Sequence, residues 1–125
     1  MTWTDDELTT MTPADELGIA SLRPDGSMRP YVTIWFVRVG GDLYVRSAYG
    51  YDNPWFQRAL TAGEGRIRVA ALERDVTFEV PASDVADAVT EAFETKYGRY
   101  GKGIVKTVVS AEAVRSTLRL VPRSA

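Results

Sequence analysis

The segment that most constrains the fold is residues 30–39, PYVTIWFVRV, because nearly all of its side chains are β-branched, aromatic or otherwise apolar. Residues of this kind favour extended strands over helices. The apolar side chains follow one another on both faces of the extended chain instead of alternating with polar ones. A strand of that composition has both faces covered, so we predict that this segment lies centrally in a sheet or barrel.

Short turns join this segment to the strands predicted on either side. Residues 24–27, PDGS, precede it and residues 40–42, GGD, follow it, and both are strong turn sequences. Neighbouring strands joined by short turns pair antiparallel. Five further stretches have strand patterns, with the third and fourth predicted as a hairpin around Glu73-Arg74: 17–22, 43–48, 67–71, 76–80 and 118–121.

Helical patterns separate these strands. Residues 4–7, TDDE, have the form of a capping box with acidic residues in the first turn, and predict a short first helix. Asn53 and Pro54 suit the start of a second helix, which Gly63 can end. Two more helices are predicted from residue 83 to Tyr97 and through residues 104–108. About six strands and four helices place the chain in the α+β class with a mostly antiparallel sheet.

Composition limits the chemistry open to the chain. Its 125 residues suit a single domain, 1–125, with one core. The absence of cysteine and histidine excludes thiol nucleophiles, imidazole bases, disulfides and typical zinc sites. The net charge of −2 gives no broad attraction to nucleic acid.

The sequence also bears on location. No apolar run approaches the roughly 20 residues that a membrane-spanning helix needs. The acidic and polar start, MTWTDDE, differs from a secretory signal, which begins basic and then becomes apolar. We therefore expect a cytoplasmic protein with no membrane segment.

One stretch combines several groups that bind anions. A strand ends at Arg46 and Ser47, Gly50 follows, and a helix that Asn53 can cap begins just beyond. Helix N-termini present unpaired N–H groups and the positive end of the helix dipole, so they suit phosphate. Arg46 and Arg58 can add charge-assisted hydrogen bonds. We therefore predict an anion-binding corner here.

The sequence allows alternative roles for the candidate binding residues. The same stretch reads equally as a plain strand–turn–helix corner with Trp55 as its core anchor. Arg29, at the entry to the apolar strand, either reaches the anion-binding corner or is an ordinary exposed hairpin arginine. Tyr97 and Tyr100, three residues apart near glycines, either stack on a planar ring and donate a proton or pack as a helix C-cap.

Signatures of other enzyme classes fail. No Gly-x-Gly-x-x-Gly follows a strand and no phosphate-loop Gly-Lys-Ser/Thr occurs. No serine sits in a nucleophile elbow, and a Ser-His-Asp triad is impossible without histidine. The chemistry that is left is the kind in which a bound cofactor transfers the electrons, while the protein supplies binding and orientation.

The order of the segments resembles a known superfamily. A turn leads into SMRP at 27–30, the apolar strand and the Gly-Gly-Asp turn follow, and the next strand ends RSA at 46–48 before NPWF at 53–56. This order resembles the split-barrel superfamily of pyridoxamine-phosphate-oxidase-like flavoproteins, and is closest to its deazaflavin-dependent nitroreductase branch. The chain also resembles the DUF2255 family of small bacterial proteins, over roughly residues 17–122.

The resemblance implies a six-stranded, mostly antiparallel split β-barrel with flanking helices. It also implies a homodimer that holds FMN or a deazaflavin coenzyme near the subunit interface. Carried over to this chain, the resemblance puts the coenzyme's phosphate near Arg29, Ser47 and the backbone around Gly50, with Trp55 and Arg58 beside it.

Two further implications concern chemistry. Tyr97 and Tyr100 match the tyrosines that line the substrate side in the nitroreductase branch, where either could deliver a proton. The nitroreductase branch has a lysine after its strand-end serine, whereas this chain has Ala48 and Tyr49 at that place. Either Arg46 or Arg58 would have to take over the role of the lysine.

These observations lead to an expected function with two alternatives. We expect a protein that binds a flavin or deazaflavin. Such a protein can act as an oxidoreductase that transfers hydride to a small organic acceptor. The alternatives are a non-catalytic barrel that binds a small ligand or cofactor, and a structural dimer without cofactor.

Overall fold

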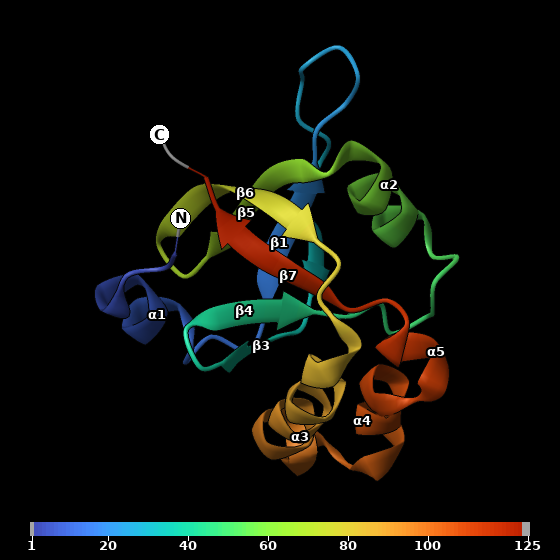
Figure 1. Cartoon of the computed structure of the whole chain (residues 1–125). Helices are drawn as coiled ribbons and strands as arrows, with labels where there is room; N and C mark the ends of the chain where they lie inside the picture. The colour runs from blue at the N-terminus through green and yellow to red at the C-terminus, as the bar shows by residue number, and fades with distance from the viewer. Residues whose placement is uncertain (1, 124–125) are drawn as a thin grey trace.

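The computed structural model describes residues 2–123 as one antiparallel sheet that curls into a nearly closed split barrel with helices packed around it (Figure 1). The strands are β1 (Leu17–Ser21), β2 (Val32–Ile34), β3 (Phe36–Val39), β4 (Asp42–Val45), β5 (Glu64–Val69), β6 (Leu72–Glu79) and β7 (Leu118–Pro122). The sheet order is β2-β1-β5-β6-β7-β4-β3, and every pairing in it is antiparallel. The predicted α+β split barrel is confirmed, with seven strands instead of six.

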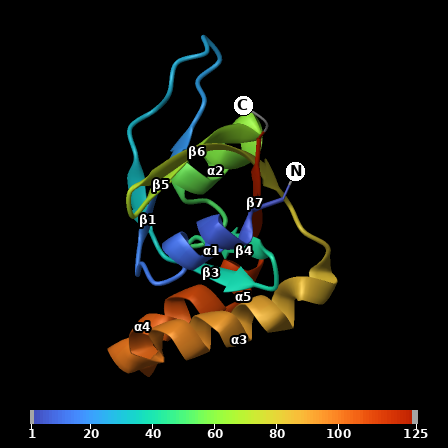
Figure 2. The same cartoon turned by 90° about the vertical axis from the view of Figure 1, so that its left-hand side faces the viewer.

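Five helices accompany the sheet within the described residues. They are α1 (Asp5–Met11), α2 (Pro54–Ala62), α3 (Ala86–Tyr97), α4 (Lys102–Val109) and α5 (Ala111–Val114), with 3₁₀ turns at Ser83–Val85 and Gly98–Tyr100. Figure 2 shows α3 and α4 as a layer under β3, while α2 lies at the opposite end of the barrel. None of these helices is long and apolar enough to cross a membrane.

The additional strand comes from the apolar segment 30–39, which breaks at Trp35 into β2 and β3. The first part pairs with β1 at one end of the sheet, and the second pairs with β4 at the other end. The prediction of a single central strand with both faces buried is therefore wrong, and Thr33 and Arg38 are exposed. Because one continuous stretch supplies both end strands, this segment is what closes the barrel.

A side chain from a distant helix supports that closure. The Tyr97 hydroxyl, at the end of α3, accepts a hydrogen bond from the Phe36 N–H at 3.1 Å and lies 2.8 Å from the Phe36 carbonyl oxygen. Lys96 Nζ donates to the same oxygen at 3.0 Å. Buried backbone groups need such partners, so α3 stabilises the chain where it passes from β2 to β3.

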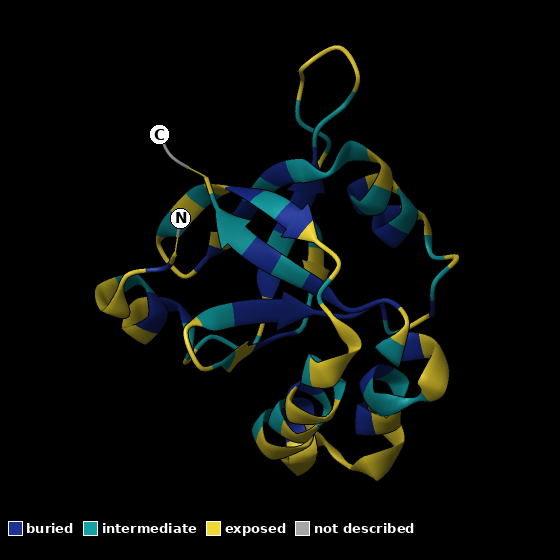
Figure 3. Cartoon of the chain, in the orientation of Figure 1, coloured by how far each residue is buried: buried dark blue, intermediate teal, exposed yellow. Residues whose placement is uncertain are grey.

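Two apolar clusters hold the layers together, and their core residues are among the buried positions coloured dark blue in Figure 3. The larger fills the barrel, where α1 and α2 contribute Leu8, Met11 and Phe56 to it. The smaller joins the outer face of β3 and β4 to the helical layer and consists of Val37, Tyr44, Val89, Phe93, Tyr97, Val105 and Val108. The helical layer is therefore packed firmly on the barrel.

Local signals in the sequence are confirmed at several places. Thr4 caps α1 through a capping box with Glu7. Pro54 begins α2, and Gly63 ends it in the left-handed conformation at φ 72°. The β5–β6 hairpin forms as predicted, but its turn falls at residues 70–71, before the Glu73-Arg74 pair, because Val69 pairs with Leu72.

Candidate functional site

Two adjoining hollows, of about 280 and 540 Å³, are lined by residues of the β1–β2 connection and of α2. Both are lined by the same three arginines, Arg23, Arg29 and Arg58. Among residues 2–123, no carboxylate lines either hollow. Guanidinium groups present planar pairs of donors that match phosphate oxygens, so this donor set, here called the arginine hollow, suits a phosphate group.

The β1–β2 connection and α2 bring these arginines together. The Leu22–Met28 bridge holds the base of the hairpin loop, which places Arg23 and Arg29 on its two arms. The Arg29 N–H donates to the Ser21 carbonyl at 3.0 Å, and Arg23 Nη1 donates to the Met28 carbonyl at 3.2 Å. Arg58 comes from α2.

These side chains differ in their other contacts. Arg23 also donates to Ser27 Oγ at 3.3 Å, so part of its guanidinium is occupied. The side chains of Arg29 and Arg58 make neither an ion pair nor a hydrogen bond within the described part of the chain. Their donors are therefore available to a ligand, with Arg29 half-buried and Arg58 exposed.

A larger groove of about 660 Å³ begins at Trp55, which also lines the smaller of the two hollows. Its apolar lining comes from β2, the chain after β4, α2 and α4: Val32, Ile34, Trp35, Ala48, Trp55, Ile104 and Val108. Its polar lining includes Glu16, Thr33, Asn53 and Thr107. Trp55 and Val32 line both spaces, so the arginine hollow and the groove lie next to each other.

The turn before α2 forms one wall of this groove. Asn53 lines the groove, and its side chain makes no capping hydrogen bond to α2. The first N–H groups of this helix thus have no partner from the capping residue. Gly50 adopts φ 92°, a conformation that favours glycine, and its Cα faces the Glu112 carboxylate. Gly50 therefore shapes the turn.

Arg46 does not reach the arginine hollow. Its side chain is 1% exposed at the inner edge of the groove, and Nε and Nη1 donate to Thr117 Oγ1 and Thr90 Oγ1 at 2.9 and 2.8 Å. Nη1 and Nη2 donate to the Val108 and Ala86 carbonyls. Burial lowers the pKa of Arg46 from 12.5 to about 10. With its donors directed to α3, α4 and the start of β7, Arg46 joins the helical layer to the barrel.

Ser47 is also fully buried and does not line the groove. Its N–H donates to Ser116 Oγ at 2.8 Å, and its carbonyl accepts from the Gly50 N–H. The Ser47 hydroxyl has no hydrogen-bond partner among the described residues. The predicted corner is thus divided: Arg29 and Arg58 meet at the arginine hollow, whereas Arg46 and Ser47 lie behind the groove.

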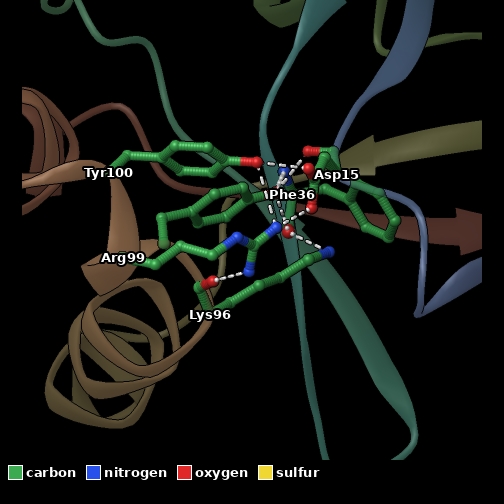
Figure 4. Close-up of polar contacts among 6 residues, drawn as sticks. Asp15, Phe36, Lys96, Arg99 and Tyr100 are labelled. Atoms are coloured by element: carbon green, nitrogen blue, oxygen red, sulfur yellow. Dashed lines mark hydrogen bonds and ion pairs between the residues drawn. The ribbon is translucent and has the colours of Figure 1, made fainter.

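Tyr97 and Tyr100 lie beside the helical layer, and neither lines the groove. Tyr97 is fully buried, with its hydroxyl 2.7 Å from the Asp15 carbonyl as well as bonded to Phe36. Tyr100 donates to the Asp15 carboxylate and accepts from Arg99, which pairs with the other oxygen of Asp15 at 2.5 Å (Figure 4). Both hydroxyls are therefore committed to structural contacts.

Burial raises the pKa of the Tyr97 hydroxyl well above its usual range, so this group keeps its proton. The hydrogen bond from Tyr100, followed by the one from Arg99, holds the pKa of Asp15 below its ordinary value, so the carboxylate stays charged. The cluster therefore contains an ion pair between Asp15 and Arg99. Its geometry favours support of the barrel closure over proton transfer to a substrate.

Lys96 in the same cluster gives a testable pH dependence. Burial lowers the pKa of Lys96 from 10.5 to about 8. Between those two values the unfolded chain binds more protons than the folded chain, so folding stability rises with pH through this window. We expect the free energy of unfolding of the wild type, relative to Lys96→Met, to rise by about 1 kcal/mol between pH 7.5 and 9.5, which is roughly half of the full linkage value because the side chain is partly exposed.

Urea unfolding of both proteins at the two pH values measures this difference. Lys102→Met, which removes an exposed lysine at the start of α4, is the matched control. A difference between wild type and Lys96→Met that stays constant with pH would show that the buried ammonium does not titrate in this window.

Comparison with known proteins identifies the family. A family profile, "Uncharacterized protein conserved in bacteria (DUF2255)", matches residues 7–120. The chain belongs to the DUF2255 family. No curated protein matches it. The resemblance predicted from the order of turns and strands is confirmed, and the matched range includes both the arginine hollow and the groove.

Solved structures show the fold that this DUF2255 protein shares. A Listeria innocua protein, provisionally named a pyridoxamine 5′-phosphate oxidase, has 14% identity and a TM-score of 0.66 over 96% of this chain and 93% of its own. An F420 reductase has 14% identity and a TM-score of 0.56 over 98% and 97%. A FAD-binding protein from Mesorhizobium loti has 14% identity and a TM-score of 0.56 over 99% and 93%. At this identity, the comparison establishes the split-barrel fold.

Arg23, Trp35 and Glu16 are among the lining residues of this DUF2255 protein that sequence reasoning missed. Arg23 was detectable, because it precedes the PDGS turn and Arg29 follows it, so an antiparallel hairpin brings them close. Trp35 was read as part of a buried strand, and its place in the groove depends on the break between β2 and β3. Glu16 lies in a connection with no motif, and no local signal marks it.

Proposed function

We propose that this DUF2255 protein binds a phosphate-bearing flavin or deazaflavin coenzyme. The observation that supports this most directly is that the arginine hollow and the groove share Trp55 and Val32 in their linings, so the two spaces lie next to each other. Arg23, Arg29 and Arg58 would hold the phosphate, and the groove would receive the planar ring. The fold of structures named as a FAD-binding protein and an F420 reductase agrees with this assignment.

The residues present fit such a coenzyme. Free guanidinium donors with no lining carboxylate suit a phosphate dianion. A largely apolar groove with a few polar groups suits a conjugated ring with hydrogen-bonding edges. Ala48 and Tyr49 stand where the resemblance leads us to expect a lysine after Ser47. The positive charge near the site comes from Arg29 and Arg58, because Arg46 is buried.

The proposed activity is oxidoreduction of a small organic acceptor in the cytoplasm. A reduced coenzyme of this class supplies the hydride when bound. The chain's own residues would bind the phosphate, orient the ring against the groove wall and exclude water from the apolar lining. Since Tyr97 and Tyr100 lie outside the groove, we infer that solvent supplies the proton. The proposal includes a homodimer, in which a second copy borders the open groove.

Ligand binding to the native state gives the test. A ligand that binds only the folded protein stabilises it by about 2.7 kcal/mol at a hundredfold excess over its dissociation constant. We expect FMN, FAD or the deazaflavin coenzyme to raise the Tm by binding to the folded protein. Differential scanning fluorimetry measures this rise. Riboflavin, which has the FMN ring without the phosphate, is the control and should give a smaller shift at equal concentration.

The opposite results separate the alternatives. Equal shifts with riboflavin and FMN would place the phosphate outside the arginine hollow. No shift with any of the three coenzymes would reject coenzyme binding and favour a structural dimer. Binding without hydride transfer to any acceptor would favour the non-catalytic barrel.

A further inference from the structure

Trp35 lies where the chain passes from β2 to β3, and this position exposes part of its ring to the groove. It is partly buried and lines the groove beside Ile34 on β2. The residues around it are fixed, since Phe36 is held by Tyr97 and by Lys96. The indole therefore projects from a rigid part of the barrel rather than from a loop.

One face of the Trp35 ring is already covered. The Tyr97 ring stacks on it with centroids 3.9 Å apart and planes inclined by 3°. The Tyr97 side chain is held in one position. Its hydroxyl is hydrogen-bonded to the backbone of Phe36 and Asp15, and its ring is fully buried. The phenol thus forms a fixed backing for the indole.

No second aromatic ring of the described residues stacks on the other face, and Trp35 lines the groove. The centroid of Tyr100 is 5.8 Å from that of Trp35 and 6.3 Å from that of Tyr97. If Tyr97 and Tyr100 covered opposite faces of the indole, their centroids would be much farther apart than this. Tyr100 therefore lies at the edge of the indole, held there by Asp15 and Arg99 (Figure 4).

We propose that the free face of Trp35 is a stacking surface for the planar ring of the ligand in the groove, and that Tyr97 is the positioning residue that holds this surface. The inference rests on the proposed function, which puts a conjugated ring in the groove. Aromatic rings attract one another in offset stacks beyond the area that they bury. Because the indole is ordered before binding, stacking on it costs little conformational entropy.

Flavin fluorescence gives a direct test, because an indole stacked on an isoalloxazine quenches its emission by electron transfer and a phenyl ring does not. The probe is FMN, or the deazaflavin coenzyme if FMN gives no Tm shift. The variants are Trp35→Phe, which keeps a flat ring against Tyr97, and Trp35→Leu, which removes it. Trp3→Phe is the matched control, since Trp3 is a tryptophan in the barrel core whose Nε1 donates to the Leu120 carbonyl.

We expect Trp35→Phe to bind the probe within about threefold of the wild-type Kd and to quench it clearly less than the wild type does, with Trp55 as the tryptophan that remains in the groove lining. Trp35→Leu should weaken binding about tenfold, the factor that corresponds to one aromatic stack. Trp3→Phe should change neither the Kd nor the quenching.

Other outcomes contradict the inference in distinguishable ways. Unchanged quenching in Trp35→Phe overturns it while coenzyme binding stands, and this variant decides the matter if Trp35→Leu does not fold. A probe that fails to bind the wild-type protein overturns the proposed function, and the inference with it. Tyr97→Phe tests the positioning role: it should lower the quenching while binding is retained, and full quenching would show that the hydroxyl does not hold the indole.

Discussion

Gly65→Ala is expected to lower the free energy of unfolding by about 3 kcal/mol or more. Gly65 pairs with Ser21 where β5 meets β1. A Cβ atom on Gly65 would lie 2.0 Å from the Ala20 carbonyl oxygen and 3.0 Å from the Phe78 ring. The closest of these atoms belongs to the backbone, so no side-chain rotation relieves the overlap. The two strands would have to separate locally, at the cost of their hydrogen bonds.

Urea denaturation measures this effect, and Gly41→Ala is the matched control. Gly41 lies in the β3–β4 turn at negative φ, and an added Cβ there meets no described atom within 4 Å. Its replacement should change stability by no more than about 0.5 kcal/mol. If both variants were equally stable, the close approach of β1 and β5 would not be a feature of the folded protein.

This contact also bears on the site. The chain enters β5 directly after Gly63 ends α2, and the Phe78 N–H on β6 donates to the Gly63 carbonyl at 2.8 Å. The Leu22 N–H donates to the Glu64 carbonyl at 3.1 Å, next to the arm that presents Arg23. Separation of β1 from β5 would therefore shift both walls of the arginine hollow.

The sequence predicted the elements whose cause is local. The capping box at Thr4 and Glu7, the Pro54 start and Gly63 end of α2, and the alternation in β5 and β6 all act within a few residues. Such signals depend on backbone geometry that neighbouring side chains determine. They were sufficient for the α+β class and for a mostly antiparallel sheet, whereas the split barrel was implied by the resemblance to a known superfamily.

The break at Trp35 could not be predicted in this way. The apolar run 30–39 is uninterrupted in sequence, and the group that bonds the Phe36 backbone at the break belongs to Tyr97, 61 positions along the chain. Periodicity reports which side chains prefer burial but not which distant hydroxyl satisfies a backbone group. The composition of segment 30–39 predicts a central strand, whereas the segment supplies the strands at the two ends of the sheet.

Arg46 shows the same limit at the candidate site. Its position after β4 and before a helix suggested a phosphate ligand, whereas its hydrogen-bond partners lie 40 to 71 positions away. An arginine without a nearby acid is expected at the surface, yet four oxygen acceptors from the helical layer and β7 satisfy this one. Arg29 and Arg58, which the resemblance places at the coenzyme's phosphate, line the same hollows.

The double variant Arg29→Ala, Arg58→Ala is expected to raise the Kd for a phosphate-bearing coenzyme at least about 100-fold. Each charge-assisted contact between a guanidinium and a phosphate contributes about 1.5–3 kcal/mol, and 1.4 kcal/mol is a factor of ten in Kd. Neither side chain makes a hydrogen bond or ion pair with the described residues, so their removal leaves no partner unsatisfied. Stability without ligand should therefore change little.

Isothermal titration with FMN, and with riboflavin for comparison, measures this change. The double variant Arg38→Ala, Arg115→Ala is the matched control, because it removes the same positive charge from positions that line neither the hollows nor the groove. It should bind within about threefold of the wild type, since exposed charges at a distance are screened by salt. Riboflavin affinity should be the same in wild type and in both double variants. If instead FMN bound the Arg29→Ala, Arg58→Ala protein as tightly as the wild type, the phosphate would lie elsewhere, and the uncapped start of α2 beside Asn53 would be the next position to examine.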